Sequence, residues 1–302
     1  MSDQLLNGAG DTVTPPTPAS AVTRPGDVLA WHPAAGPVDM EPRMSHDRAH
    51  AEGGPDRPPL VGVTVVVPAR NEEKALPHCL TALERALVEV SHLAPAMTLR
   101  ACIVLDSCTD DSLAIVRAFA AAAVHRGLFS VEPLDVTVGS VGRARAAGVR
   151  HALEWAAQDG IDPAALWLAS TDADTHVPPH WLSAHVATAD AGADAYVGTV
   201  EPDAALTGAR REEWMERHHL REGHPHVHGA NLGVRASAYL RVGGFAPLAL
   251  HEDVDLVERL RAEDGRLVRA ADDARVVTSS RLDARAVGGF ATYLANLRGG
   301  VA

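Results

Sequence analysis

The sequence predicts an α/β protein with one central, mostly parallel sheet flanked by helices. Two apolar runs, at residues 61–67 and 164–169, indicate buried strands, and the first is rich in β-branched valine. Strand-like and helix-like segments alternate through the first half of the chain, which is typical of a parallel sheet with helices on both faces. Ligands of such sheets bind at the carboxyl ends of the strands.

The first half supplies most of the expected elements. The run at 61–67 is followed by a helical segment, and Thr109 or Asp110 can cap the next helix with a side-chain oxygen. Strands are expected at 61–67, 99–105, 134–138 and 164–169, and helices between them at 76–90, at about 110–125 and at 141–157.

The second half is less regular. Strands are expected at 195–200 and 231–234, and a helix at 212–222. Residues 251–262 predict a further helix, because acidic residues fall in its first turn, where the helix dipole favours anions. The sequence contains no internal repeat.

Composition divides the chain in two. Residues 1–59 are rich in Pro, Gly, Ala and Asp without a sustained period, so we expect a disordered tail there and one folded domain at 60–302. The three cysteines have no C-x-x-C spacing and favour a reducing compartment over a disulfide framework.

The charge and the apolar runs exclude several classes of partner. A formal net charge of −12 disfavours nonspecific binding to nucleic acid or anionic lipid. No apolar run approaches the roughly 20 residues of a membrane helix, and no secretory signal is visible, so we expect a cytoplasmic protein without an integral membrane segment. The sequence does not indicate an oligomeric state.

The strongest candidate site follows the run at 164–169, in the sequence Asp172-Ala-Asp174. Side chains at i and i+2 of an extended chain point to the same side, so both carboxylates can converge on one cation. Oxygen ligands suit Mg²⁺ or Mn²⁺. The alternative is a polar loop that caps a helix after Pro178-Pro179-His180.

The end of the first strand has two interpretations. In the first, Pro68 ends the sheet ladder and the following loop holds a nucleotide through backbone N–H groups and the charge of Arg70. In the second, the loop is an ordinary turn with Asn71 as helix N-cap and acidic residues in the first turn. The nucleotide interpretation assigns this contact to Pro68, Ala69, Arg70 and Glu72.

Two further strand ends carry candidate nucleotide-binding residues. Asp106 ends the second strand and can accept a hydrogen bond from a base N–H, whereas Asp110 is better placed to cap the next helix. The segment 139–148 opens a helix with glycines and with Arg143 and Arg145, which can pair with phosphate. Helix packing accounts equally well for Gly148.

The ordered set of these motifs resembles the family 2 glycosyltransferases of the GT-A fold. It comprises Val-Val-Pro-Ala-Arg-Asn-Glu-Glu, a strand ending in Asp106, Gly-Arg-Ala-Arg-Ala-Ala-Gly, Asp-Ala-Asp, Gly243-Gly-Phe245 and His251-Glu-Asp253, and covers residues 61–290. The resemblance implies a GT-A-like domain with a nucleotide-binding first half and an acceptor-binding second half.

The resemblance also implies roles for single residues. Asp106 would contact the nucleotide base, Arg145 would lie near the base or phosphate, and the Asp172–Asp174 pair would bind the metal on the diphosphate, chiefly through Asp174. Asp253 would be the catalytic base. There are two departures: Leu105 stands where many relatives have a second acid, and no histidine follows His251, which puts a third protein ligand in doubt.

The alternating histidines His224, His226 and His228 share one side of an extended chain. A zinc site is one interpretation. The neighbouring proline and glycines favour instead an ordered loop that lines the acceptor or sugar region, with His228 and Asn231 closest to its centre.

These observations together predict a metal-dependent, inverting hexosyltransferase. It would take its sugar from a nucleotide-diphosphate donor, UDP-linked by resemblance, and pass it to an unidentified hydroxyl of a small molecule, lipid or glycan. Glu252 and His251 would position Asp253 or bind the acceptor. The alternatives are a nucleotidyltransferase, disfavoured because Lys74 is the only lysine after the first strand, and a noncatalytic nucleotide-sugar-binding module.

Overall fold

A computed structural model describes residues 57–265, 267–283 and 289–297. The chain divides into two units, Met1–Pro42 and Arg43–Ala302, and every described residue belongs to the second. The expected tail at 1–59 therefore lies outside the described residues, except for its last three.

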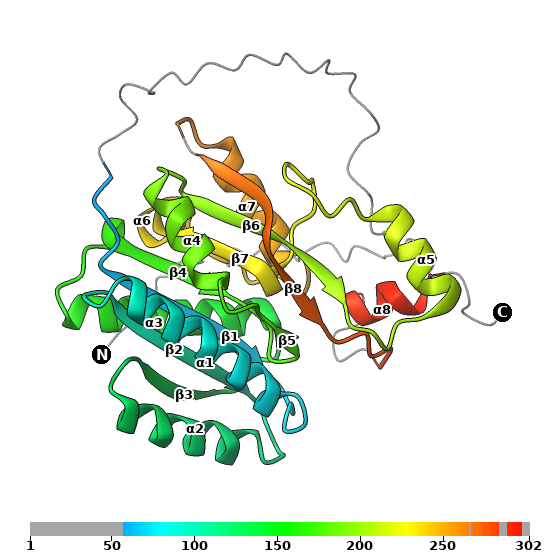
Figure 1. Ribbon diagram of the computed structural model, residues 1–302, viewed down its shortest axis with the longest axis horizontal. Helices are drawn as coiled ribbons and strands as arrows, with labels where there is room; N and C mark the ends of the chain where they lie inside the picture. Colours follow the sequence, from blue (N-terminus) through cyan, green and yellow to red (C-terminus); the bar gives the residue numbers. More distant parts are fainter. Residues whose placement is uncertain (1–56, 266, 284–288, 298–302) are drawn as a thin grey trace, which may run out of the picture. The chain divides into compact units, whose positions relative to one another are not determined.

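The described chain forms one sheet of eight strands in the order β3-β2-β1-β4-β7-β6-β8-β5 (Figure 1). Its strands are β1 Gly62–Ala69, β2 Thr98–Asp106, β3 Ser130–Val136, β4 Leu166–Ser170, β5 Thr175–His176, β6 Ala195–Pro202, β7 Leu232–Arg235 and β8 Val268–Thr278.

The sheet changes character along its width. The strands β3, β2, β1 and β4 are all parallel, whereas β7 runs antiparallel to both β4 and β6. Beyond β6, β8 returns to the parallel direction and β5 closes the edge antiparallel to β8. This arrangement confirms the α/β prediction, because the parallel half coincides with the regularly alternating first half of the sequence.

Helices cover both faces of the sheet. They are α1 Leu76–Leu93, α2 Ser112–Arg126, α3 Val141–Gln158, α4 Trp181–Asp190, α5 Gly208–Arg217, α6 Ala236–Arg241, α7 Glu252–Ala262 and α8 Phe290–Ala295, with short 3-10 turns at Pro163–Ala165 and Gly229–Asn231.

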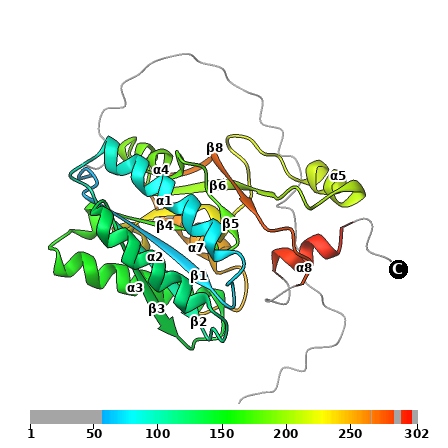
Figure 2. The same cartoon turned by 60° about the horizontal axis from the view of Figure 1, so that its bottom comes forward.

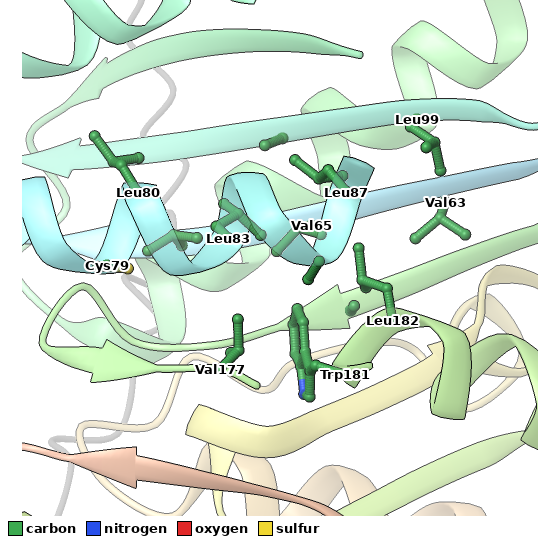
Figure 3. Packing of buried hydrophobic residues seen from close by; sticks show 14 of the residues in the cluster. Val63, Val65, Cys79, Leu80, Leu83, Leu87, Leu99, Val177, Trp181 and Leu182 are labelled. Carbon is green, nitrogen blue, oxygen red and sulfur yellow. The ribbon is translucent and has the colours of Figure 1, made fainter. Parts of the chain in front are cut away.

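Each face of the sheet has its own apolar core. On one face α1, α2 and α4 pack against the strands, and Figure 3 shows Leu80, Leu83 and Leu87 of α1 together with Leu182 of α4 beside Val65 of β1. On the other face α3, α6 and α7 pack together. Burial on both faces explains why β1, apart from Thr64, is apolar rather than alternating.

Gly148 of α3 lies where this helix crosses the sheet. A side-chain carbon at this position would collide with Val66 of β1 and Val104 of β2. The packing explanation of this glycine is therefore confirmed.

Pro68 does not end the ladder on both sides of β1. It pairs with Val104 of β2, and the pairing continues to Ala69 and Leu105. On the other side, the ladder with β4 ends at Val66. The expectation that Pro68 stops the sheet was wrong for β2, because the missing N–H matters only on the side where β1 no longer pairs.

The second half differs most from the sequence prediction. Helix α5 covers 208–217 instead of 212–222, and the long strand β8 was not expected at all. Helix α5 lies beside α8 (Figure 2), and its Trp214 packs with Leu294 and Leu297. Within the described residues, no helix combines the length and the apolar character that crossing a membrane requires.

Candidate active site

The loops after β1 and β2 are tied together at the carboxyl edge of the sheet. Asn71 and Ser107 have positive φ angles of 54° and 56°. The Asn71 Oδ1 atom accepts a hydrogen bond from the Thr109 N–H at 2.8 Å. Helix α1 begins only at Leu76, so Asn71 is not its N-cap, and the interpretation of this loop as an ordinary cap was wrong. The side chain of Asn71 instead fixes the neighbouring loop.

Asp106 is buried at the end of β2. Its Oδ1 accepts a hydrogen bond from the Val138 N–H at 2.9 Å, and its Oδ2 accepts one from the Gly139 N–H at 2.9 Å. The carboxylate therefore fixes the loop that leads into α3. Asp110 accepts hydrogen bonds from the N–H groups of Ser112 and Glu73. The N-cap of α2 is Asp111, so Asp110 contacts the first helical N–H from one residue before the cap position that was expected for it.

Arg145 joins two of the sequence motifs through two ion pairs, one buried with Glu252 and one part-buried with Asp172. Its Nη2 lies 2.5 Å from Asp172 Oδ1, and its Nη1 pairs with Glu252 Oε1. Its Nε donates to Ser170 Oγ at 3.2 Å. The guanidinium, only 4% exposed, thus links the end of β4 with the start of α7. Sequence reasoning placed Arg145 beside the nucleotide and did not find these carboxylate partners.

The protonation of this cluster follows from burial and charge. Burial opposes the charge of Arg145, but Asp172 and Glu252 outweigh it and raise the pKa of the guanidinium. Burial raises the pKa of Glu252, while the nearby Arg145 charge acts in the opposite direction. The ion pairs therefore keep an arginine charged in a place that would otherwise disfavour any charge.

Asp253 points to the same cluster from the first turn of α7. Its Oδ2 accepts a hydrogen bond from the Gly229 N–H at 2.6 Å. A side-chain carbon at Gly229 would collide with the Arg145 guanidinium. Asp253 is therefore linked through Gly229 to Arg145, and through Arg145 to Asp172.

Asp174 lies on a second ion-pair network with a residue that the sequence analysis missed. Arg281, which follows β8, places its Nη2 3.0 Å from Asp174 Oδ2. The same guanidinium donates to both carboxylate oxygens of Glu72, at 2.9 and 2.7 Å. Arg281 thus ties β8 to the loop after β1. The only local signal for it was the polar sequence Ser279-Ser-Arg281 after a β-branched run.

The carboxylates of Asp172 and Asp174 fit a hard cation in part. Burial raises the pKa of Asp174 to about 6, the charge of Asp172 adds to this, and Arg281 opposes it. In the described part of the chain, no group of three His, Cys, Asp or Glu side chains is arranged to hold a metal. Two carboxylates suit Mg²⁺ or Mn²⁺ if substrate phosphates and water complete the coordination.

The three residues expected near the acceptor differ in burial and in their contacts. Asn231 is fully buried, and its amide group binds Thr199 O and Ala274 O at 2.9 Å and accepts from the Trp181 indole. These hydrogen bonds hold Asn231 in the core, so its side chain is not available to an acceptor. His251 is exposed, with a φ of 62°, directly before α7. His228 is half-buried, next to Gly229.

The alternating histidines form a stacked row. The rings of His224 and His226 lie 6.1 Å apart, and those of His226 and His228 lie 6.3 Å apart. Burial, together with the neighbouring imidazoles, lowers the pKa of His226 to about 4 and that of His228 to about 3. His224 Nε2 lies 3.1 Å from Val197 O. Among the described residues the three rings therefore stack in a row, and their nitrogens are not arranged to hold a zinc ion.

Comparison with known proteins identifies the family. A model of "Glycosyl transferase family 2" matches residues 64–239, more than half of the chain. The chain belongs to glycosyl transferase family 2. The matched region begins inside β1 and extends past β7. It includes Asp106, Arg145 and the Asp172–Asp174 pair, and it ends before Asp253. Among curated proteins, none matches this sequence.

Solved structures are similar at low identity. A mycobacterial protein is 15% identical, with 75% of this chain and 68% of that chain covered and a TM-score of 0.42. Glucosyl-3-phosphoglycerate synthase from Mycobacterium tuberculosis, solved with Mn²⁺, UDP and glucosyl-3-phosphoglycerate, is 15% identical, with 72% and 70% covered and a TM-score of 0.36. A 4-diphosphocytidyl-2C-methyl-D-erythritol synthase from Anaerococcus prevotii is 10% identical, with 70% and 87% covered and a TM-score of 0.38.

Proposed function

We propose that this family 2 protein transfers a sugar from a UDP-linked donor to a hydroxyl acceptor, with inversion and with the help of Mg²⁺ or Mn²⁺. The observation that carries the proposal is the Arg145 bridge. It brings the Asp172 end of β4 and the Glu252 start of α7 into one cluster, although Arg145 and Glu252 are 107 residues apart in the sequence. A binding module has no need of the second motif at this place.

The donor would lie along the carboxyl ends of β1, β2 and β4. The loop Pro68-Ala69-Arg70 and the carboxylates of Asp106, Glu72 and Asp172 border this edge of the sheet. Asp106 already accepts two backbone N–H groups, so in our proposal its contribution to base recognition comes from the shape of that loop together with any remaining carboxylate lone pair. Arg145 acts here on the carboxylates and only through them on the diphosphate.

Asp172 and Asp174 would hold the cation. When bound, it would neutralise the charge that builds on the departing diphosphate. Each carboxylate uses only one oxygen in its described ion pair, Asp172 with Arg145 and Asp174 with Arg281. The other oxygen of each remains as the ligand in our proposal.

Asp253 would act as the base. The acceptor oxygen forms a bond to the anomeric carbon, the bond from that carbon to the diphosphate breaks, and its electron pair leaves with the nucleoside diphosphate. The proton of the hydroxyl passes to the Asp253 carboxylate. Glu252 is fixed by Arg145 and therefore positions α7, while the exposed His251 directly precedes this helix.

Donor binding is tested by calorimetry with UDP and GDP, in Mn²⁺ and in EDTA. We expect UDP to bind only with the cation, and Asp174→Asn to weaken this binding while the fold is retained. Equal affinity in EDTA would reject the metal role. A preference for UDP that survives in Asp106→Ala would reject base recognition by Asp106.

Catalysis is tested by the release of UDP from UDP-sugars. Asp253→Asn keeps an oxygen that can accept the Gly229 N–H, so the fold should persist while release falls by about 10²–10⁴-fold. Asp255→Asn, two residues further along α7 and paired with Arg259, is the matched control. UDP binding without any release by the parent protein would favour the noncatalytic module.

A further inference from the structure

A cavity of about 430 Å³ opens beside the Asp174–Arg281 ion pair. Its lining comes from the β6–α5 connection, the first turn of α5 and the chain after β8. The lining includes Asp203, Thr207, Arg210, Ser280 and Arg281. The cavity volume is in the range of small-molecule sites.

The lining carries one arginine, Arg210, that pairs with no acidic side chain among the described residues. Arg210 forms no ion pair within the described part of the chain, and its Nε is a buried atom without a hydrogen-bond partner there. This Nε has almost no exposed surface and is out of reach of a ligand, but no described carboxylate pairs with the guanidinium, so its charge would attract an anion in the cavity. Arg211, its neighbour on α5, pairs instead with Glu201 at 2.8 Å and does not line the cavity.

The start of α5 adds positive potential to the same wall. Thr207 precedes the helix without capping it through its side chain, and the first turn contains no acidic residue. The N–H groups of a first turn and the helix dipole both favour an anion. Thr207 and Arg210 face the cavity from this turn.

Arg281 connects the cavity to the donor site. Its guanidinium is shared between Glu72, Asp174 and the cavity wall. A cation on Asp174 would neutralise one of its partners and leave Arg281 more of its charge for a ligand in the cavity. Asp203 is the one acidic lining residue. Its Oδ1 already accepts from Ser280 Oγ at 2.5 Å and from the Ala205 N–H at 3.1 Å.

From this wall we infer that the cavity receives the acceptor, and that the acceptor is a small hydroxylated molecule with an oxyanion, a phosphate or a carboxylate. Arg210 and the start of α5 bind the oxyanion, and Asp203 receives a hydroxyl. This inference rests on the proposed function, because only a transferase has an acceptor substrate to bind. Oxyanion binding itself does not depend on it.

Calorimetry on the full chain tests the oxyanion site with four probes: inorganic phosphate, glycerol phosphate, glycerate and glycerol. Each is titrated with and without saturating UDP and Mg²⁺, so that phosphate cannot report on the diphosphate site. We expect the anionic probes to bind and glycerol not to bind. Phosphate and carboxylate are distinguished by whether glycerol phosphate or glycerate binds more tightly.

Variants locate the binding. Arg210→Gln should weaken the anionic probe by about tenfold or more, Arg210→Lys should retain part of the affinity, and Arg211→Gln should bind as the parent does. UDP affinity should be equal in all four proteins. Equal probe affinity in Arg210→Gln and the parent, or no anion binding by the parent, would overturn the inference. If the parent protein does not bind UDP at all, the proposed function is overturned instead. If Arg210→Gln does not fold, the titrations of Arg210→Lys test the site instead. An Arg210→Lys variant that binds every anionic probe as tightly as the parent does, and behaves as the parent does with glycerol, would count against the site.

Discussion

Arg281 Nη2 lies 3.0 Å from Asp174 Oδ2, so a protein cation already stands at one of the two carboxylates that we assign to the metal. The same guanidinium is bidentate on Glu72. A metal ion and this arginine repel each other at close range. The structure thus links metal affinity to the chain that follows β8.

Replacing Arg281 should strengthen metal binding. In Arg281→Gln the repulsion is gone while both carboxylates remain, so we expect Mn²⁺ affinity to rise by about three- to tenfold. The unfolding midpoint without metal should fall, because Glu72 and Asp174 lose their shared partner. Calorimetry with Mn²⁺ measures the first effect and thermal unfolding the second.

Arg275→Gln serves as the control for Arg281→Gln. Arg275 lies on β8 and pairs with Glu201 and Asp272, away from Asp174. Its loss should leave Mn²⁺ affinity unchanged. A weaker affinity in Arg281→Gln than in this control would mean that Arg281 supports the metal site instead of competing with it.

Removing only one partner of the Arg145 ion pairs should lower the free energy of unfolding strongly. Arg145→Ala leaves the carboxylate of Glu252 buried without its cation, which we expect to cost about 3–5 kcal/mol in the free energy of unfolding. The double variant Arg145→Ala/Glu252→Gln should recover part of this loss, because the unpaired charge is gone. Urea unfolding of both single variants and the double variant measures the coupling. Additive losses would show that Arg145 acts through packing alone.

The first half of the fold could be predicted because its signals are local. Val63, Val65 and Val67 of β1 are buried, and such β-branched runs need no distant information to indicate a strand. Strand β8 could not be recognised in this way, because Asp272 and Arg275 interrupt its apolar pattern. In the structure these two charges pair with each other and, for Arg275, with Glu201 of β6.

The site was predictable in its positions and not in its pairings. The end of β4 and the start of α7 were identified as acidic motifs from their neighbours in the chain. That Arg145 bridges them depends on the crossing of α3 over the sheet, and Arg281 reaches Glu72 across 209 residues. Such partners are set by tertiary packing, which a single sequence does not encode at any fixed spacing.

Gly148 should not tolerate alanine. The added methyl group meets Val66 and Val104 at the crossing of α3 with the sheet, so we expect Gly148→Ala to lower the free energy of unfolding by about 1–3 kcal/mol. Val66→Ala in the same chain makes room for the methyl group and should make the alanine at 148 less costly. Urea unfolding of the four proteins of this cycle measures it. A loss in Gly148→Ala that Val66→Ala leaves unchanged would point to helix α3 itself as the cause.

His185 should make the protein less stable in mild acid. It is fully buried, and its Nδ1 accepts a hydrogen bond from the Trp167 indole at 3.1 Å. Burial lowers its pKa to about 3, against about 6.5 for an unfolded histidine. Between these values the unfolded chain binds a proton that the folded chain does not. The contribution of His185 is therefore complete above pH 6.5 and is lost as the pH falls toward 3.

The slope of the free energy of unfolding against pH tests this. One proton corresponds to about 1.4 kcal/mol per pH unit, so His185→Asn, whose Oδ1 can still accept from Trp167, should flatten the slope between pH 4 and 6 by about that amount. The same change at the exposed His92 is the control and should leave the slope as it is in the parent. Equal slopes in the His185 variant and the parent would show that His185 is protonated in the folded state, and the Trp167 hydrogen bond would then have to be broken.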